Sequence, residues 1–235
     1  MPVHHAAEAA LVDALARAQR LHAERAGDDA LHRALLHLAD WQSRRLLQTY
    51  ADLASDARYR AAIDFFRTDL YGNETMARRD ADVARVVPTL VRMLPERVIA
   101  TIAQAMELNV LSHTLDREVQ RHLPVASSFT VSDYCEAYRC AGDIPARHRQ
   151  IHLIVEVGRS LDSFVRKPLL RGALTMMRKP ARLAGFSTLH DFLERGFNAF
   201  RRMHGAEAFL ATIEVRETAL CNAIVAGETA PFPEP

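Results

Sequence analysis

Residues 96–123 read ERVIATIAQAMELNVLSHTLDREVQRHL, and this stretch decides the fold class. Its apolar residues recur at helical spacing around most of the circumference: Ile99, Ile102, Ala103, Met106, Leu108, Val110, Leu111, Leu115 and Val119. A helix that is apolar on nearly every side has to be covered by other elements. The stretch therefore predicts a long helix in the middle of a helical bundle.

Most other segments repeat this helical spacing, and no strand-like alternation is bounded by hairpin signals. The predicted fold class is all-α, a multi-helix bundle of about nine or ten helices with no sheet. Breaks are expected at Gly27 with Asp28, at Pro95 and at Gly205. The predicted helices cover residues 5–26, 29–54, 57–71, 79–93, 96–123, 131–141, 146–166, 169–183, 188–204 and 206–226.

The chain has the length and apolar content of one large domain. We expect a single helical domain over residues 1–228, in which the loop PVASSF separates two candidate halves, 1–123 and 130–228. The tail TAPFPEP contains three prolines and cannot continue a helix. Residues 229–235 are therefore expected to be disordered.

Composition limits the location and the partners. The net charge is +1, so no overall bias points to nucleic acid or to an anionic membrane. The three cysteines form no C-x-x-C pair, which favours a reducing, cytoplasmic location. The N-terminus lacks the apolar core of a signal peptide, and no apolar run is long enough for a transmembrane helix. Only two of the basic residues are lysine, which together with the abundant alanine suggests a GC-rich bacterial genome.

The stretch FFRTDLYG, residues 65–72, poses the question of a functional acid. Phe66 and Leu70 fall on one apolar stripe with Tyr59, Ala62 and Ile63, and Gly72 can end the helix. Burial thus explains the aromatic residues. Asp69 lies at the boundary of that stripe and has no such explanation.

This stretch resembles the signature of an uncharacterised bacterial family that is named for an FFLEELY motif. Further blocks match along most of the chain: RRD at 78–80, LSHTLD at 111–116, VRKPLL at 165–170, DFLERGFNAF at 191–200 and ATIEVRE at 211–217. The resemblance implies a helical protein with no assigned activity. Arg67 and Thr68 depart from the motif, whereas Asp69 keeps an acid at its second acidic position.

Four polar residues on or beside apolar helix faces are the candidates for a catalytic site: Asp69, Glu107, His113 and Glu217. One interpretation is a metal or acid–base site, since carboxylates and histidine that project inward from different helices build such sites. The other is a set of buried ion pairs with arginine, and we favour it. A ferritin-like di-iron centre is disfavoured, because no histidine follows a glutamate by three residues.

His148, His152 and Glu156 form a second polar pattern, at four-residue spacing on one predicted helix. This spacing suits a divalent ion. The ladder points away from the apolar face of its helix, however, so we interpret it as a solvated surface.

A basic segment runs from Val157 to Phe186, with seven basic residues against Asp162 alone. Its expected anion- or partner-binding residues are Arg166, Lys167, Arg171, Arg178, Lys179 and Arg182. The segment suits pairing with acidic residues of its own domain, for instance near Asp80 and Asp82, or with a protein partner or a second copy of the chain. Peripheral contact with an anionic membrane is the alternative. Nucleic acid is disfavoured as the ligand, since no aromatic residues are interleaved with these charges.

No dinucleotide, P-loop, zincin or serine-hydrolase motif occurs in the chain. The sequence identifies no cofactor and no confident metal site. We therefore predict a non-enzymatic helical binding protein of the bacterial cytoplasm. The alternatives are an enzyme that uses the four polar residues at a metal or acid–base site, and a pocket for an apolar ligand among the phenylalanines.

Overall fold

The computed structural model describes residues 2–70, 76–124 and 128–235. It is all-α, with no strand among these residues, which confirms the predicted fold class. The α-helices are α1 (Pro2–Ala26), α2 (Asp29–Thr49), α3 (Ala51–Ser55), α4 (Arg60–Phe65), α5 (Met76–Met93), α6 (Glu96–His122), α7 (Val131–Ala141), α8 (Ile144–Val165), α9 (Pro168–Leu183), α10 (Ser187–Arg202) and α11 (Glu207–Val225). A π-helical turn, η1 (Phe66–Leu70), follows α4 directly.

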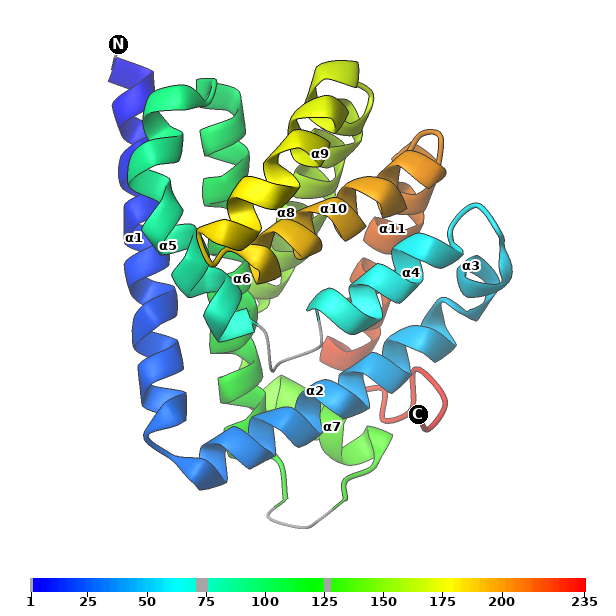
Figure 1. Ribbon diagram of the computed structural model, residues 1–235. Coiled ribbons are helices and arrows are strands. Elements are labelled where there is room, and N and C mark those ends of the chain that lie inside the picture. The colour runs from blue at the N-terminus through cyan, green and yellow to red at the C-terminus, as the bar shows by residue number, and fades with distance from the viewer. Residues whose placement is uncertain (1, 71–75, 125–127) are drawn as a thin grey trace.

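Helix α6 is the segment with which the sequence argument begins, and it lies centrally in the bundle (Figure 1). It packs along α1, α7 and α8, and it also contacts α2 and α5. Its buried side chains include Ile99, Met106, Val110, Leu115 and Val119. The helix that the sequence predicts to be apolar on most sides thus has neighbouring helices on several sides.

The helix breaks follow the expected local chemistry. Asp28 caps α2, where its side chain accepts hydrogen bonds from the backbone N–H groups of Ala30 and Leu31. Pro95 precedes α6 directly. Gly205 has φ = 122° between α10 and α11, a conformation that glycine adopts readily. Gly72 lies outside the described residues.

Two predicted helices are divided in the structure. The predicted helix 29–54 is interrupted at Tyr50, where the backbone leaves the helical region and separates α2 from α3. Tyr50 is buried, and its hydroxyl donates to Glu217 Oε1 at 2.8 Å. The predicted helix 57–71 begins only at Arg60 and widens into η1. The helical spacing of apolar residues continues through both of these breaks, so the sequence pattern does not reveal them.

The buried side chains form three clusters. One lies between α1, α5 and α6, and the other two combine residues from before and after the loop at Pro124. One of these two includes Trp41, Val119 and Cys221. The tail 229–235, for which we expected disorder, is not helical, and its Phe232 ring lies 6.0 Å from the ring of Trp41.

Two glycines allow helices to approach closely. A Cβ atom on Gly158 of α8 would lie 2.4 Å from Leu210 Cδ2 of α11. A Cβ atom on Gly196 of α10 would lie 2.9 Å from Cζ of Phe65, at the end of α4. Both distances are shorter than van der Waals contact, so glycine sets the spacing of these helix pairs.

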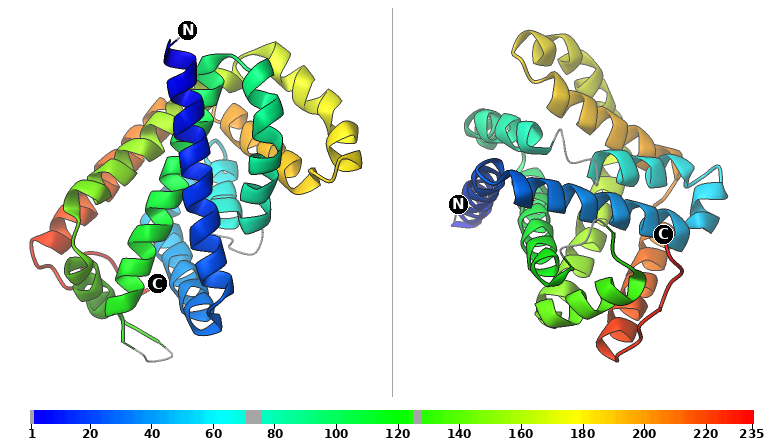
Figure 2. Two further views of the ribbon diagram at one scale, coloured as in Figure 1. Left: turned by 90° about the vertical axis from the view of Figure 1, so that its left-hand side faces the viewer. Right: turned by 90° about the horizontal axis from the view of Figure 1, so that it is seen from below.

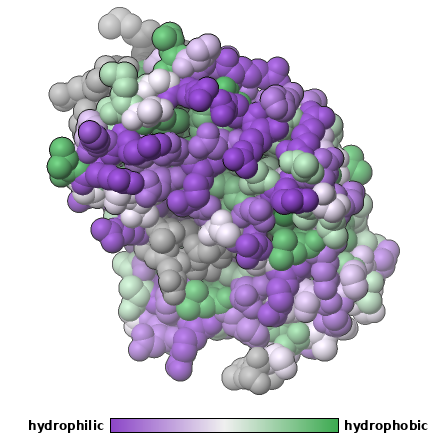
Figure 3. Space-filling model, turned by 45° about the vertical axis from the view of Figure 1, so that its right-hand side comes forward, coloured by the Kyte–Doolittle hydropathy of each residue, from purple (hydrophilic) through white to green (hydrophobic). Residues whose placement is uncertain are grey.

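The face drawn in Figure 3 is mainly hydrophilic, with hydrophobic residues in small patches. Helices α9 and α10 form a hairpin that protrudes from the rest of the bundle in both views of Figure 2. Across the described residues, no helix combines the length and apolar character needed to cross a membrane.

Candidate functional site

The three predicted carboxylates bind three different arginines. Asp69 in η1 accepts from Arg195 of α10, with Nε at 3.0 Å from Oδ1 and 3.2 Å from Oδ2. Glu107 of α6 pairs with Arg17 Nη1 of α1 at 2.8 Å. Glu217 of α11 pairs with Arg45 Nη1 of α2 at 2.7 Å. This arrangement is the one that the ion-pair interpretation expects.

The burial of these pairs differs. The Asp69 and Glu217 side chains are 7% and 21% exposed, whereas those of Glu107 and Arg17 are both 36% exposed. Tyr50 also donates to Glu217, so that carboxylate has two donors of different kinds. Glu107 therefore lies at the surface of the bundle, although the apolar residues around it in the sequence indicated a buried position.

The fourth candidate, His113, lies near a polar junction between α1, α5 and α6. Its ring contacts that of His22 edge to face, with centroids 5.5 Å apart. His22 Nε2 donates to Asp80 Oδ2 at 2.9 Å, and Asn109 Nδ2 donates to the same oxygen at 2.7 Å. Asp80 is only 1% exposed, so these donors compensate for the desolvation of its charge.

Burial determines the protonation of His113. Burial first, and the neighbouring His22 second, lower the pKa of the imidazole to about 4. His113 Nε2 has no hydrogen-bond partner in the part of the chain that is described. His113 is therefore neutral near pH 7 and lies beside the Asp80 junction without a hydrogen bond to it.

Three of the sequence blocks that carry the family resemblance meet around Asp69. Arg79 of the RRD block donates from Nη1 to the Asp69 carbonyl at 3.1 Å. Its guanidinium also stacks over Phe192, 4.3 Å from the ring centroid. Phe192 and Arg195 belong to the DFLERGFNAF block, and Phe65 opens FFRTDLYG with its ring 5.3 Å from Phe192. Contacts among residues of these three blocks hold η1 between α5 and α10.

The basic segment occupies the end of α8 and the whole of α9. Only Ala181 of α9 is fully buried, although Leu170 and Leu174 are partly covered. Leu169, Met176 and Leu183 are 87%, 79% and 90% exposed, and they recur at intervals of seven residues. Such spacing places three large apolar side chains on one outward face of the helix.

The charges of the basic segment differ in their pairing. Arg166 binds Asp162 and Arg178 binds Glu194, so two of the six predicted binding residues are engaged within the chain. Glu194 in turn has a lowered pKa, chiefly because it accepts the Arg178 hydrogen bond. Within the described residues, the side chains of the other four form no ion pair: Lys167, Arg171, Lys179 and Arg182.

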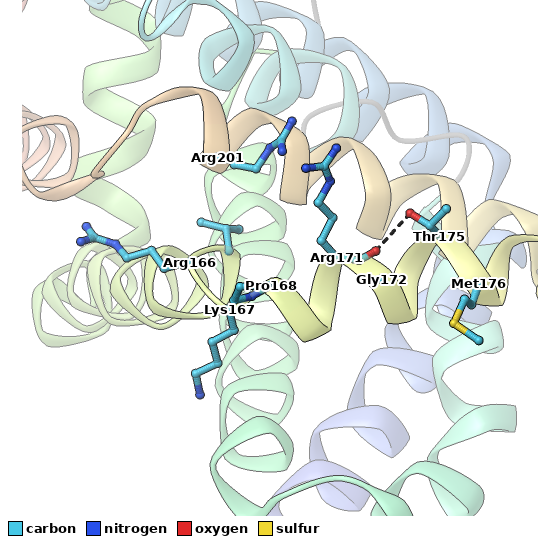
Figure 4. Close-up of a pocket in the computed structure, with 9 residues that line it drawn as sticks. Arg166, Lys167, Pro168, Arg171, Gly172, Thr175, Met176 and Arg201 are labelled. Carbon is cyan, nitrogen blue, oxygen red and sulfur yellow. Dashed lines mark hydrogen bonds between the residues drawn. The ribbon is translucent and has the colours of Figure 1, made fainter.

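A hollow of about 610 Å³ lies where α8, α9 and α10 meet. The described residues that line it include four basic side chains and no acidic one: Arg166, Lys167, Arg171 and Arg201. In Figure 4 the guanidinium groups of Arg171 and Arg201 lie beside each other, one from α9 and the other from α10. Two neighbouring cations without an acid between them attract an anionic group.

Sequence reasoning missed Asp80 and Arg201. Asp80 was quoted only as part of the RRD block and as an acid near the basic segment, and its burial depends on His22 and Asn109 from two other helices. Arg201 lies outside the basic segment in sequence and joins it only because α10 folds back along α9. The RRD block was the sequence signal for Asp80, and none existed for Arg201.

Comparison with protein families gives one finding. A family model described as "Domain of unknown function (DUF8198)" matches residues 21–231. Comparison with curated proteins and with solved structures gives no significant match.

Proposed function

The chain belongs to this domain family of unknown function, and from that premise we propose that it is a non-enzymatic binding protein. Its contact element is α9, and its partner is a protein that presents an acidic, amphipathic helix. The observation that carries the proposal is the outward apolar face of α9, on a helix where Arg171, Lys179 and Arg182 form no ion pair within the described residues.

The apolar face supports a helical partner. Leu169, Met176 and Leu183 repeat at the heptad interval, which is the spacing at which one helix packs along another. Met177 is also 54% exposed and lies at the edge of this face. Methionine side chains adapt to different partner surfaces, and helix-in-groove recognition uses such apolar anchors.

The charges support an acidic partner. Arg171, Lys179 and Arg182 are exposed on α9. At about 100° per residue, Lys179 lies about 60° from the centre of the apolar face, and Arg171 and Arg182 lie about 120–140° from it on the same side of the helix. The hollow adds Arg201 at one end of this row. Opposite charge on the partner would speed association and fix its orientation along α9.

A protein partner suits these observations better than an anionic membrane. Helix α9 carries no tryptophan, tyrosine or phenylalanine, which helices at the membrane interface use as anchors. The hollow between α8, α9 and α10 is also lined by four basic side chains, which an acidic side chain of a protein partner would complement. We place this activity in the bacterial cytoplasm, in keeping with the three free cysteines and the scarcity of lysine.

The alternative function, an enzyme with a metal or acid–base site built from Asp69, Glu107, His113 and Glu217, receives less support. Each of its carboxylates accepts from a different arginine, which is the arrangement that the ion-pair interpretation expects.

A labelled synthetic peptide tests the proposal. The probe is a fluorescein-labelled helical peptide with leucine at every a and d position and glutamate on both flanks, followed by fluorescence anisotropy. We expect the native chain to bind it in a salt-sensitive manner. Reversal of three charges, Arg171→Glu with Lys179→Glu and Arg182→Glu, should weaken binding at least tenfold.

The matched control reverses three exposed arginines on other helices, Arg33→Glu with Arg44→Glu and Arg97→Glu. This control should bind the peptide like the native chain. Equal loss in both triple variants would reduce the effect to net charge and overturn the proposal. Stronger binding to vesicles of phosphatidylserine and phosphatidylcholine would favour the membrane instead, and a concentration-dependent dimer in sedimentation that the α9 variant abolishes would favour self-association.

A further inference from the structure

The start of α10 carries a compact group of possible metal ligands that the sequence analysis did not identify. His190 Nδ1 lies 3.8 Å from Asp191 Oδ1 and 4.0 Å from Glu194 Oε2. One ligand atom from each of the three residues lies within 4.8 Å of the other two. His190 and Glu194 are four residues apart and share one face of the helix, and Asp191 follows His190 directly.

The hydrogen bonds of His190 determine which nitrogen faces this group. His190 Nε2 lies 2.8 Å from the backbone carbonyl of Leu174 in α9. A carbonyl oxygen only accepts, so Nε2 carries the hydrogen and donates it. In the neutral ring, Nδ1 is then a lone-pair acceptor that faces two carboxylates.

His190 is only 5% exposed, and its Nδ1 atom is buried without a hydrogen-bond partner in the described structure. The distances of 3.8 and 4.0 Å from Nδ1 to the two carboxylate oxygens exceed hydrogen-bond distance. A buried lone pair beside two anionic oxygens is unfavourable. A cation with affinity for nitrogen as well as oxygen, placed between the three groups, would satisfy all of them.

We propose that His190, Asp191 and Glu194 bind a divalent first-row transition metal ion, for which Zn²⁺ is the reference case. Imidazole nitrogen favours zinc and its neighbours over Mg²⁺ or Ca²⁺, which prefer oxygen ligands. Zinc bonds of about 2.0–2.2 Å require ligand atoms about 3.4 Å apart, so small side-chain rotations close the site. Three protein ligands leave one position open to water or to a ligand supplied by another molecule.

The outer contacts of this site come from α9. The Leu174 carbonyl fixes the tautomer of His190, and Arg178 holds Glu194 through Oε1, which leaves Oε2 directed to the group. Such contacts orient metal ligands. A bound ion would thus tie α10 to α9, and the inference does not depend on the proposed partner surface.

Metal titration tests the site. The full chain, freed of any affinity tag and stripped with EDTA, is titrated with Co²⁺ by visible absorption and with Zn²⁺ by calorimetry. We expect one ion per native chain. Asp191→Asn and Glu194→Gln should each weaken binding at least tenfold, since each removes a charged ligand. The Asp191 side chain is 44% exposed, so its variant should fold normally, as circular dichroism can verify.

Two controls separate this site from other sources of binding. His152→Ala with Glu156→Gln removes a histidine–glutamate pair at the same four-residue spacing on α8, where the two side chains lie 3.2 Å apart and His152 is exposed. Arg178→Met breaks the contact with Glu194 but keeps the three ligands. Both controls should still bind one ion. No binding by the native chain, undiminished binding by Asp191→Asn and Glu194→Gln, or loss in the α8 control would each overturn the proposal.

Discussion

Charged residues have different surroundings in the interior of the bundle and on the surface of α9. Asp69 and Glu217 are mostly covered, and each lies against an arginine from a distant part of the chain. Arg171, Lys179 and Arg182 are exposed and form no ion pair within the described residues. The interior charges are therefore committed to holding helices together, whereas those on α9 remain available to another molecule.

Apolar residues show the same contrast. Leu210 is 1% exposed and packs against Gly158 of α8, whereas Leu183 of α9 is 90% exposed. Substitutions in the two regions should therefore differ in cost by several kcal/mol. Measurements of the free energy of unfolding can therefore distinguish residues that stabilise the fold from residues of the candidate contact surface.

The largest effect is expected from the buried ion pair of Arg45 and Glu217. Arg45→Met leaves the Glu217 carboxylate without its charged partner and should lower the free energy of unfolding by about 3 kcal/mol. Urea denaturation measures this change. The adjacent exposed pair of Arg44 with Asp40 is the matched control, and Arg44→Met should cost less than about 1 kcal/mol. Equal costs would remove the distinction between interior and surface charge.

His113 should make stability depend on pH. Its pKa falls from 6.5 in the unfolded chain to about 4 in the folded one, so between these values only the unfolded state takes up the proton. The stabilisation present above pH 6.5 is thus lost as pH falls toward 4, by about 3 kcal/mol in all. His113→Leu should remove this dependence.

The comparison of urea denaturation at pH 7 and pH 4.5 isolates the contribution of His113. The raised pKa of Asp116, which burial causes, acts in the opposite direction in this range but equally in both proteins. A native chain and a His113→Leu variant with parallel pH profiles would contradict the assignment.

Two glycines test the packing contrast. Gly158→Ala places a methyl group against Leu210 in the core and should destabilise the fold by about 2 kcal/mol. Gly172→Ala on α9 meets nothing within 4 Å and should stabilise it by about 0.5–1 kcal/mol, because alanine favours the helix. Thermal unfolding measures both. A destabilising Gly172→Ala would mean that α9 is covered.

The smallest effect is expected on the outward face of α9. Met176→Ser and Leu183→Ser should change the free energy of unfolding by less than about 0.5 kcal/mol, since both side chains are already in water. The same variants should weaken binding of the acidic helical peptide. A cost above about 1 kcal/mol in dilute solution would indicate that this face packs within its own molecule.

Local patterns predicted most helices and the basic segment, but not the partners of the charged residues. The apolar stripe placed Asp69 at its edge but did not identify a partner for the carboxylate. In the structure Asp69 binds Arg195 of α10, 126 residues further along the chain. Helical spacing gives the face of a residue, and the partner depends on which helix lies opposite.

The group at His190 shows the same limit. Its spacing, H-D-x-x-E, is visible in the sequence, but a search for E-x-x-H does not find it. The more regular ladder of His148, His152 and Glu156 shows clearer spacing, yet both of its histidines are exposed. What distinguishes His190 is burial beneath α9 and the Leu174 carbonyl, which only the α9–α10 hairpin provides.

The sequence by itself determined the helical class, the breaks at Asp28, Pro95 and Gly205, and the amphipathic, basic character of α9. These properties are local, because they depend on a period of about 3.6 residues and on the chemistry of helix ends. Only the tertiary structure decided which arginine neutralises which carboxylate and which apolar face stays uncovered. Those outcomes depend on contacts between segments that are distant in the sequence, such as Asp69 with Arg195, and no local period encodes them.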